Sequence, residues 1–311
     1  MTTSAVGRAA GSDSRVWDRV ISIFIKSETV RGYTLLSPAL AIMILALAAP
    51  LFLLVIYSFW TQDGIVVDTT FTLDRYREIF SGDAAANYRH LFVRTLWISG
   101  LVTLATVLIA YPMAYYVAFH VKRQKFVWLV LLTIPFWTSY LLRVFAWKII
   151  LGYNGVINSS LVQLGLLTQP LEFLLYNPTA VVITLAHAYA AFAILPIYVS
   201  LEKIDRSVLE AASDLGDSPW TRFWRITLPL SFPGVIAAAV VIFVPTTGDF
   251  VTPSLVGGTT SVMIANVIQV QFGKINDWPM GAALAMSSIA LVAIIVVFVI
   301  GALRASVARI R

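Results

Sequence analysis

Long stretches without charged residues alternate with shorter polar segments along this chain of 311 residues. A helix needs about 20 apolar residues to cross the hydrocarbon core of a bilayer, and six stretches contain or nearly fill such a helix. The pattern therefore predicts an all-α, polytopic membrane protein with six transmembrane helices. The predicted helices lie at about 33–60, 94–120, 126–150, 178–200, 231–254 and 281–304.

The amino-acid composition favours the same fold class. Hydrophobic residues make up 59% of the chain and charged residues 12%, with a mean hydropathy of +0.84, whereas a soluble domain carries roughly 25% charged residues. The chain must therefore bury its apolar surface in membrane lipids rather than in one core. It contains no cysteine, which excludes a disulfide framework and a thiol nucleophile.

The basic residues indicate the orientation of the helices. Most of the 22 lysine and arginine residues lie in segments that face the cytoplasm if both termini are cytoplasmic, as the positive-inside rule requires. Membrane topology thus accounts for the net charge of +6, and we expect no nucleic-acid partner.

The chain divides into a predicted cytoplasmic tail over 1–30 and a transmembrane domain over 31–311. Between 14 and 26, apolar residues share one helical face and charged residues the opposite face. This pattern favours a short helix on the inner membrane surface. A partly ordered tail is the alternative.

A polar loop over 202–229 separates the fourth and fifth predicted helices. Ser207 can cap a first short helix, which Gly216 would end in the left-handed conformation. Ser218 and Pro219 suit the start of a second helix, and we expect Pro229 to end it before the next span. The motif residues of the loop are Glu210, Ala211, Ala212 and Gly216, followed after nine residues by Ile226-Thr227-Leu228-Pro229.

This motif resembles the cytoplasmic loop of the permeases of binding-protein-dependent ABC importers. The resemblance implies a type I ABC importer permease fold in the inner membrane of a bacterium. It also implies three protein partners: ATP-binding cassette subunits, a second homologous permease subunit and a periplasmic solute-binding protein. The alternative is an ordinary inner loop with helix-favouring composition. The residues that the resemblance assigns to ATPase coupling are Glu210, Ala211, Ala212 and Gly216.

The fifth predicted helix is interrupted by Pro245-Thr246-Thr247-Gly248-Asp249. Proline removes a backbone hydrogen bond and glycine tolerates unwinding, and broken helices at membrane depth often mark solute sites. A carboxylate near membrane depth, here Asp249, also favours a functional role. The alternatives are an ion pair with Arg143 or Lys148, or a place at the outer interface. The residues of this segment that we predict on the substrate path are Pro245, Thr247 and Asp249.

The third predicted helix carries aromatic residues that recur, together with Arg143, at spacings of three or four residues. Such spacing places them on one helical face. Aromatic rings attract an ammonium group by roughly 0.5–2 kcal/mol each, which suits a cationic solute. The alternative is ordinary packing with an interfacial aromatic belt. The residues of this helix that we predict on the substrate path are Phe136, Trp137, Tyr140 and Trp147.

Several segments are similar to those of spermidine/putrescine importer permeases, and the likeness covers roughly residues 30–305. They include Ile134-Pro135-Phe136-Trp137-Thr138-Ser139-Tyr140, Phe243-Val244-Pro245, Gly248-Asp249-Phe250-Val251, Leu255-Val256-Gly257-Gly258 and Asp277-Trp278-Pro279. This resemblance implies transport of a polyamine. An opine, another organic cation or an iron complex remains the alternative solute. Since Asp249 is one carboxylate and a polyamine needs several, a second permease subunit would supply further acids.

No catalytic chemistry is evident. The chain lacks the Gly-x-x-x-x-Gly-Lys-Ser/Thr phosphate loop, and His90, His120 and His187 are too widely spaced to suggest a metal site. We therefore predict a transport subunit without catalytic residues, metal or cofactor, with ATP hydrolysis in a separate partner. An ion-coupled secondary transporter would have no need of the Glu210 loop, and a membrane-embedded enzyme would need convergent reactive groups.

Overall fold

The computed structural model of the chain describes residues 28–308, and Met1–Ile56 and Tyr57–Arg311 form two separate compact units. The described part of the first unit lies in helix α2 (Glu28–Tyr57), whose last residue belongs to the second unit and which continues through Pro38 and Pro50. Membrane helices tolerate internal proline because local adjustments and neighbouring groups satisfy the freed backbone atoms. The surface helix predicted between 14 and 26 lies outside the described residues.

The described residues contain six helices that are long and apolar enough to cross a membrane. This number confirms the predicted fold class. The candidate spans are Gly32–Tyr57, Ala85–Phe119, Tyr140–Gln163, Pro178–Glu202, Pro219–Thr247 and Trp278–Gly301.

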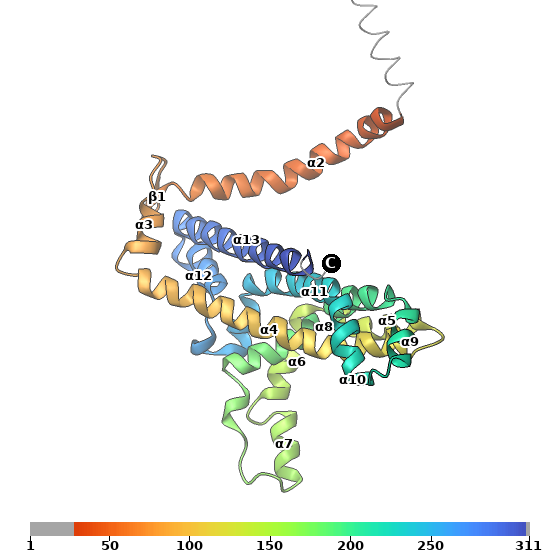
Figure 1. The fold of residues 1–311 in the computed structure, drawn as a ribbon. Helices are drawn as coiled ribbons and strands as arrows, with labels where there is room; N and C mark the ends of the chain where they lie inside the picture. Colours follow the sequence, from red (N-terminus) through yellow and green to blue (C-terminus); the bar gives the residue numbers. More distant parts are fainter. Residues whose placement is uncertain (1–27, 309–311) are drawn as a thin grey trace, which may run out of the picture. The chain divides into compact units, whose positions relative to one another are not determined.

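Three long helices pack together at the centre of the second unit: α4 (Ala85–Phe119), α8 (Pro178–Glu202) and α11 (Leu228–Thr247) (Figure 1). Small residues let them approach closely, as is usual where lipid gives helices no hydrophobic reason to associate. A Cβ atom added to Gly234 of α11 would stand 2.5 Å from the carbonyl oxygen of Pro196 in α8. Fully buried small residues of the same core include Ala110, Ala114, Ala193 and Ala238.

Shorter helices connect and flank this core. The remaining α-helices are α3 (Asp74–Ser81), α5 (Lys125–Thr133), α6 (Tyr140–Leu151), α7 (Val156–Gln163), α9 (Arg206–Asp214), α10 (Pro219–Arg222), α12 (Ile264–Val270) and α13 (Trp278–Ala308). The 3-10 and π-helical turns are η1 (Ile134–Trp137), η2 (Glu172–Leu174), η3 (Phe223–Thr227), η4 (Pro253–Gly257), η5 (Thr259–Ser261) and η6 (Gln271–Ile275).

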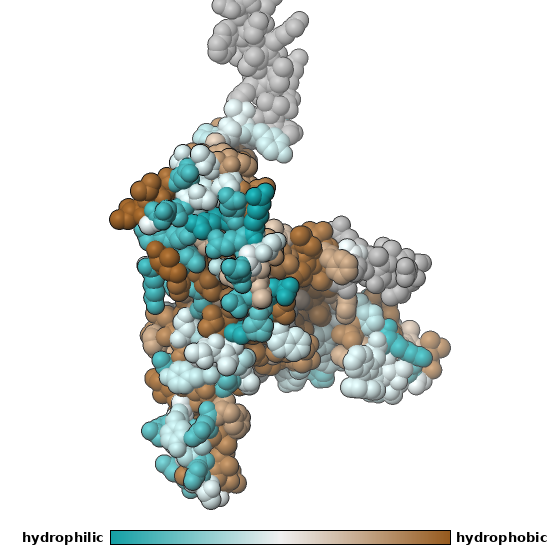
Figure 2. All heavy atoms as spheres, turned by 90° about the vertical axis from the view of Figure 1, so that its left-hand side faces the viewer, coloured by the Kyte–Doolittle hydropathy of each residue, from teal (hydrophilic) through white to brown (hydrophobic). Residues whose placement is uncertain are grey.

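A small hairpin lies beside α3, and polar contacts tie this region to the start of α13. Strands β1 (Thr61–Asp63) and β2 (Val66–Asp68) pair antiparallel. The side-chain amide of Gln62 donates a hydrogen bond to the carbonyl of Asn276 (2.7 Å), and Arg75 forms an ion pair with Asp277 (3.1 Å). Hydrophilic side chains gather over this part of the surface in Figure 2. The polar segment after the first span is thus an ordered part of the second unit.

The prediction of one continuous third helix over 126–150 is wrong. The chain forms α5, then the 3-10 turn η1, and the residues Thr138 and Ser139 are extended before α6 begins. Pro135 in this turn lacks the N–H that an α-helix needs and restricts the backbone of the residue before it. The candidate span in this region is instead Tyr140–Gln163, which includes α6 and α7.

The expected break at Pro229 is also wrong. The helical path from Pro219 to Thr247 is continuous, because α10 passes through the π turn η3 directly into α11. The N–H of Leu228 donates to the carbonyl of Phe223, five residues earlier. This wider turn redirects the backbone hydrogen bonds, and Pro229 then occupies the first turn of α11, where proline is tolerated. The second helix of the polar loop is therefore joined to the fifth span.

We expect Gly234→Ala to destabilise the protein, because the new methyl group would overlap α8. Overpacking costs roughly 1–3 kcal/mol, and an overlap with a backbone oxygen at 2.5 Å puts this site at the upper end of that range, above the gain of about 1 kcal/mol from replacing glycine by alanine in a helix. Gly100→Ala in α4 is the control, since nothing lies within 4 Å of its added Cβ. Thermal unfolding of the detergent-purified proteins should show a lower melting temperature for Gly234→Ala only. Equal melting temperatures would contradict the close contact.

Candidate functional site

The first helix of the polar loop, α9, has well-defined ends. Its N-cap is Asp205, whose carboxylate accepts a hydrogen bond from the N–H of Ser207 (2.9 Å). The prediction that Ser207 itself is the cap is wrong by two positions. The backbone hydrogen bond from Ser207 lowers the pKa of Asp205 below its ordinary value, because a donated hydrogen bond stabilises the charged carboxylate. At the other end, Gly216 has φ +91°, which confirms its predicted left-handed conformation.

The second helix, α10, begins as predicted and is braced against the first. The hydroxyl of Ser218 accepts a hydrogen bond from the N–H of Thr221 (3.2 Å), and Pro219 stands in the first turn. Arg222 donates hydrogen bonds to the hydroxyl of Ser213 (3.1 Å) and to the carbonyl of Leu209 (3.4 Å). These bonds make the two helices one structural piece.

The motif residues of this loop divide between two faces. The side chains of Glu210 and Ala211 are exposed, as is Gly216, whereas Ala212 is buried against its own subunit. Leu215, next to Gly216, is 89% exposed. The exposed face is therefore suited to a partner, with Ala212 supporting it from behind.

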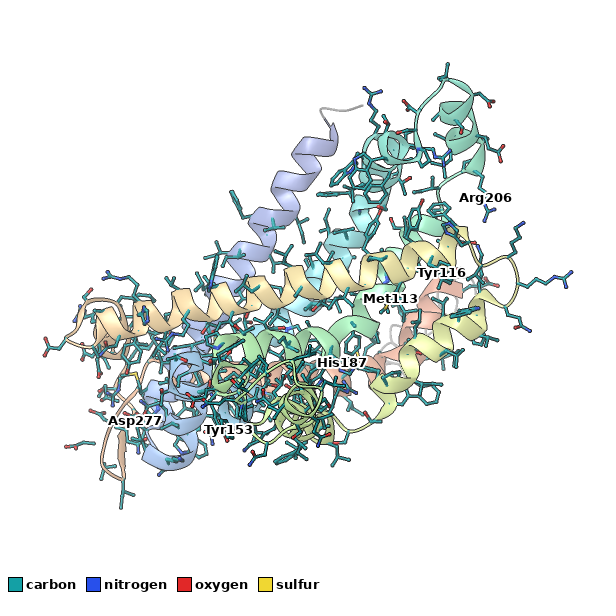
Figure 3. All side chains as sticks on the ribbon, turned by 90° about the horizontal axis from the view of Figure 1, so that it is seen from below. Met113, Tyr116, Tyr153, His187, Arg206 and Asp277 are labelled. Atoms are coloured by element: carbon teal, nitrogen blue, oxygen red, sulfur yellow. The ribbon has the colours of Figure 1, made fainter. Side chains whose placement is uncertain are left out.

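The loop lies far from the start of α13. Arg206, at the start of α9, and Asp277, just before α13, lie at opposite ends of α4 (Figure 3). The structure thus separates the two-helix loop from the hairpin region by the length of a membrane-spanning helix.

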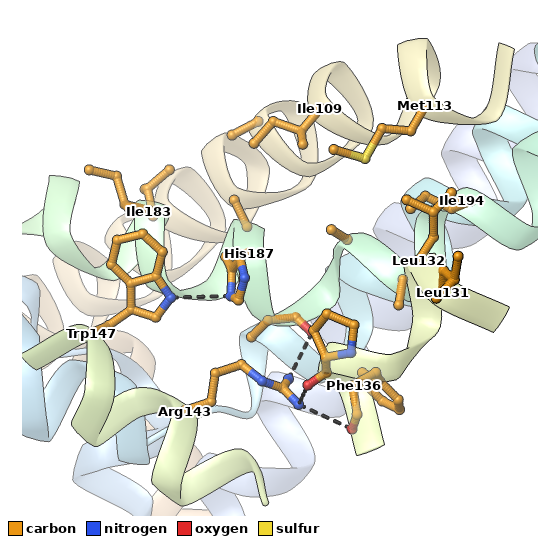
Figure 4. A pocket seen from close by; sticks show the side chains of 17 residues that line it. Ile109, Met113, Leu131, Leu132, Phe136, Arg143, Trp147, Ile183, His187 and Ile194 are labelled. Atoms are coloured by element: carbon orange, nitrogen blue, oxygen red, sulfur yellow. Dashed lines mark hydrogen bonds between the residues drawn. The ribbon is translucent and has the colours of Figure 1, made fainter. Parts of the chain in front are cut away.

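A cavity of about 430 Å³ lies between these two ends, beside α8 (Figure 4). Apolar residues of α4, α5 and α8 form most of its wall, and Phe136 and Trp147 of the predicted substrate path also line it. The indole N–H of Trp147 donates a hydrogen bond to Nδ1 of His187 (3.2 Å). Among the described residues that line the cavity, the ionisable side chains are Arg143 and His187, and no carboxylate is present.

Asp249 does not line this cavity, and its carboxylate bonds to groups of its own chain. One carboxylate oxygen accepts a hydrogen bond from the hydroxyl of Tyr140 (2.6 Å), and the other accepts from the N–H groups of Val251 (2.9 Å) and Thr252 (3.4 Å). Asp249 therefore caps the backbone where the chain becomes helical again after α11. Arg143, considered as its ion-pair partner, instead donates to carbonyl groups.

The other predicted substrate-path residues are dispersed. Trp137 is 77% exposed, and Pro245 is exposed in the last turn of α11. Thr247 is buried and lines a second cavity of about 580 Å³ together with Phe250 and Gln269. Sequence spacing alone missed His187 as a partner of Trp147, because the two residues come from different helices and meet only in the folded subunit.

The family model and the most similar curated proteins indicate the same family for this chain. Residues 20–310 match the family described as "Binding-protein-dependent transport system inner membrane component". The chain is 36% identical over 242 residues to the spermidine/putrescine transport system permease protein PotB of Escherichia coli, which covers 78% of this chain and 86% of that protein. PotB of Haemophilus influenzae is 34% identical over 248 residues, with coverage of 79% and 85%.

Solved structures agree with the fold. A bacterial ABC transporter involved in the import of the acidic polysaccharide alginate contains a chain that aligns with a TM-score of 0.64 and 19% identity. The alignment covers 93% of this chain and 98% of that chain. The likeness supports the fold of an ABC importer permease.

We expect Tyr140→Phe to destabilise the subunit, because it removes the hydroxyl that pairs with the buried carboxylate of Asp249. A hydrogen bond to a charged group contributes about 1.5–3 kcal/mol. Tyr153→Phe is the matched control, since the Tyr153 side chain is exposed just after α6. Thermal unfolding in detergent should show a lower melting temperature for Tyr140→Phe and an unchanged melting temperature for the control. A melting temperature equal to that of the control would refute the structural role of this bond.

Proposed function

This chain belongs to the family of binding-protein-dependent transport system inner membrane components, and from that membership we propose its solute, partners and orientation. It is a permease subunit of an ABC importer and a multi-pass protein of the inner membrane. We propose that it carries a polyamine such as spermidine or putrescine. The observation that supports this solute is the 36% identity to PotB over 78% of the chain.

The proposed partners are a pair of ATP-binding cassette subunits, a second homologous permease and a periplasmic solute-binding protein. The exposed face of α9, with Glu210, Ala211 and Gly216, would dock on an ATP-binding subunit. Because Arg222 braces α9 against α10, and α10 continues through η3 into α11, a push on the loop would pass directly to the fifth span. ATP hydrolysis is assigned to the partner subunit.

The cavity supports the solute proposal in part. Trp147 lines the cavity with an aromatic ring that suits cation–π contact with an ammonium group, whereas the guanidinium of Arg143 already lies over the ring of Phe136 (5.4 Å). Asp249 already bonds Tyr140 and two backbone N–H groups, so the carboxylates that a polyamine needs would come from the second permease. An opine is the alternative solute, because the described lining of the cavity offers no carboxylate to an ammonium group.

The orientation is part of the proposal: both termini and the α9–α10 loop face the cytoplasm, and the β1–β2 hairpin faces the periplasm. Since the chain has no cysteine, single substitutions can report it. We expect an impermeant maleimide to label Ile65→Cys, in the exposed hairpin turn, from outside intact spheroplasts. It should label Leu215→Cys only in inside-out vesicles. The reverse labelling pattern would refute the orientation.

The function is tested with the complete importer in liposomes, supplied with spermidine and its binding protein. We expect spermidine uptake that requires ATP, and we expect Glu210→Lys to reduce both uptake and spermidine-stimulated ATP hydrolysis by about tenfold or more, as loss of an interface hot spot does. Asp68→Lys on the exposed hairpin is the control charge reversal. Uptake of an opine instead of spermidine would replace the solute assignment. Uptake without ATP would indicate an ion-driven carrier.

A further inference from the structure

The break between α5 and α6 leaves carbonyl groups that no helix satisfies. From Pro135 to Thr138 the chain is a 3-10 turn followed by extended backbone, in a segment flanked by apolar helices. Backbone carbonyls at membrane depth need hydrogen-bond donors, because lipid offers none. The break can therefore persist only if some side chain supplies donors.

Arg143 supplies most of them from the first turn of α6, and the hydroxyl of Thr138 also donates to the carbonyl of Pro135 (2.9 Å). One of its terminal nitrogens lies 2.9 Å from the carbonyl oxygen of Pro135, 3.1 Å from that of Phe136 and 3.1 Å from that of Thr138. The other terminal nitrogen donates to the carbonyl of Ala188 in α8 (3.2 Å). The guanidinium thus joins the break to the central helix α8, and the side chain is only 8% exposed.

The same clamp positions an aromatic ring in the cavity. The guanidinium carbon of Arg143 lies 5.4 Å from the centre of the Phe136 ring. That ring also packs edge-on against Phe192 of α8, with ring centres 4.1 Å apart, and it lines the cavity. Bonds to the carbonyls on both sides of Phe136 restrict its backbone, so the direction of the ring depends on Arg143.

We propose that Arg143 is a positioning residue for the solute path: it holds the break between α5 and α6 and thereby sets the ring of Phe136 in the cavity wall. Its charge is engaged by backbone dipoles and is not directed at the solute. The consequence for spermidine rests on the proposed function, whereas the position of Phe136 does not. Lysine cannot replace this role, because a single ammonium lacks the planar fork of donors.

The primary test reads the position of residue 136 without any solute. Phe136→Cys is introduced alone and together with R143K in the assembled importer, prepared with partner subunits whose reactive cysteines have been replaced. The rate of modification by a small polar methanethiosulfonate is then measured. We expect R143K to raise this rate by about tenfold, the change in an equilibrium that follows from losing one charge-assisted hydrogen bond.

Two controls separate positioning from general loosening. L142A alters the exposed neighbour of Arg143 in α6 and should leave the rate at residue 136 unchanged. Ile109→Cys reports the cavity wall from α4, and its rate should not change with R143K. An unchanged rate at 136, or equal increases at 136 and 109, would overturn the proposal. The decision rests on R143K, because the more severe variant R143Q could prevent assembly of the importer.

The second readout is transport. In the wild-type complex supplied with spermidine and its binding protein, we expect R143K to raise the KM for spermidine by about tenfold and L142A to leave it unchanged. Basal ATP hydrolysis of L142A should equal that of the wild-type complex. A KM unaltered by R143K would contradict the inference. If the wild-type complex does not take up spermidine, the proposed function fails, and the labelling experiment still tests Arg143.

Discussion

Every peptide group inside the membrane needs a hydrogen-bond partner, and this requirement governs where the spans of this permease can break. At the break before α6, the cation Arg143 donates to free carbonyls. After α11, the anion Asp249 accepts from the free N–H groups of Val251 and Thr252. Each break thus uses a buried charge whose sign matches the backbone groups left without a helical partner.

This use of charge changes how the solute path is understood. A charged residue at membrane depth is a natural candidate for contact with a solute, yet in this subunit both candidates bond to their own backbone. What remains for the cavity is shape and aromatic surface, from Phe136 and Trp147. Under the proposed function, strong recognition of a charged solute would therefore require groups from the partner subunits.

The two ends of the subunit are built by different means. At the hairpin end, Gln62 bonds to Asn276 and Arg75 forms an ion pair with Asp277. Contacts between residues distant in sequence therefore stabilise this end. At the other end, α9 and α10 have local caps and one brace, Arg222. Local capping keeps the loop rigid while its outer face, including Glu210, stays free of the core. A rigid piece with an exposed face can transmit movement.

The hydrophobic pattern alone determined the number of spans, and local chemistry determined the turn between the two helices of the polar loop. The left-handed Gly216 and the cap at Ser218 depend on a few neighbouring residues, so they could be predicted. The place of Asp249 beside Tyr140 could not, because these residues are 109 positions apart. Nor could the break at Pro135 or the continuity through Pro229. Whether a proline interrupts a helix depends on which groups, near or distant, satisfy the freed backbone atoms, and only the tertiary structure brings those groups together.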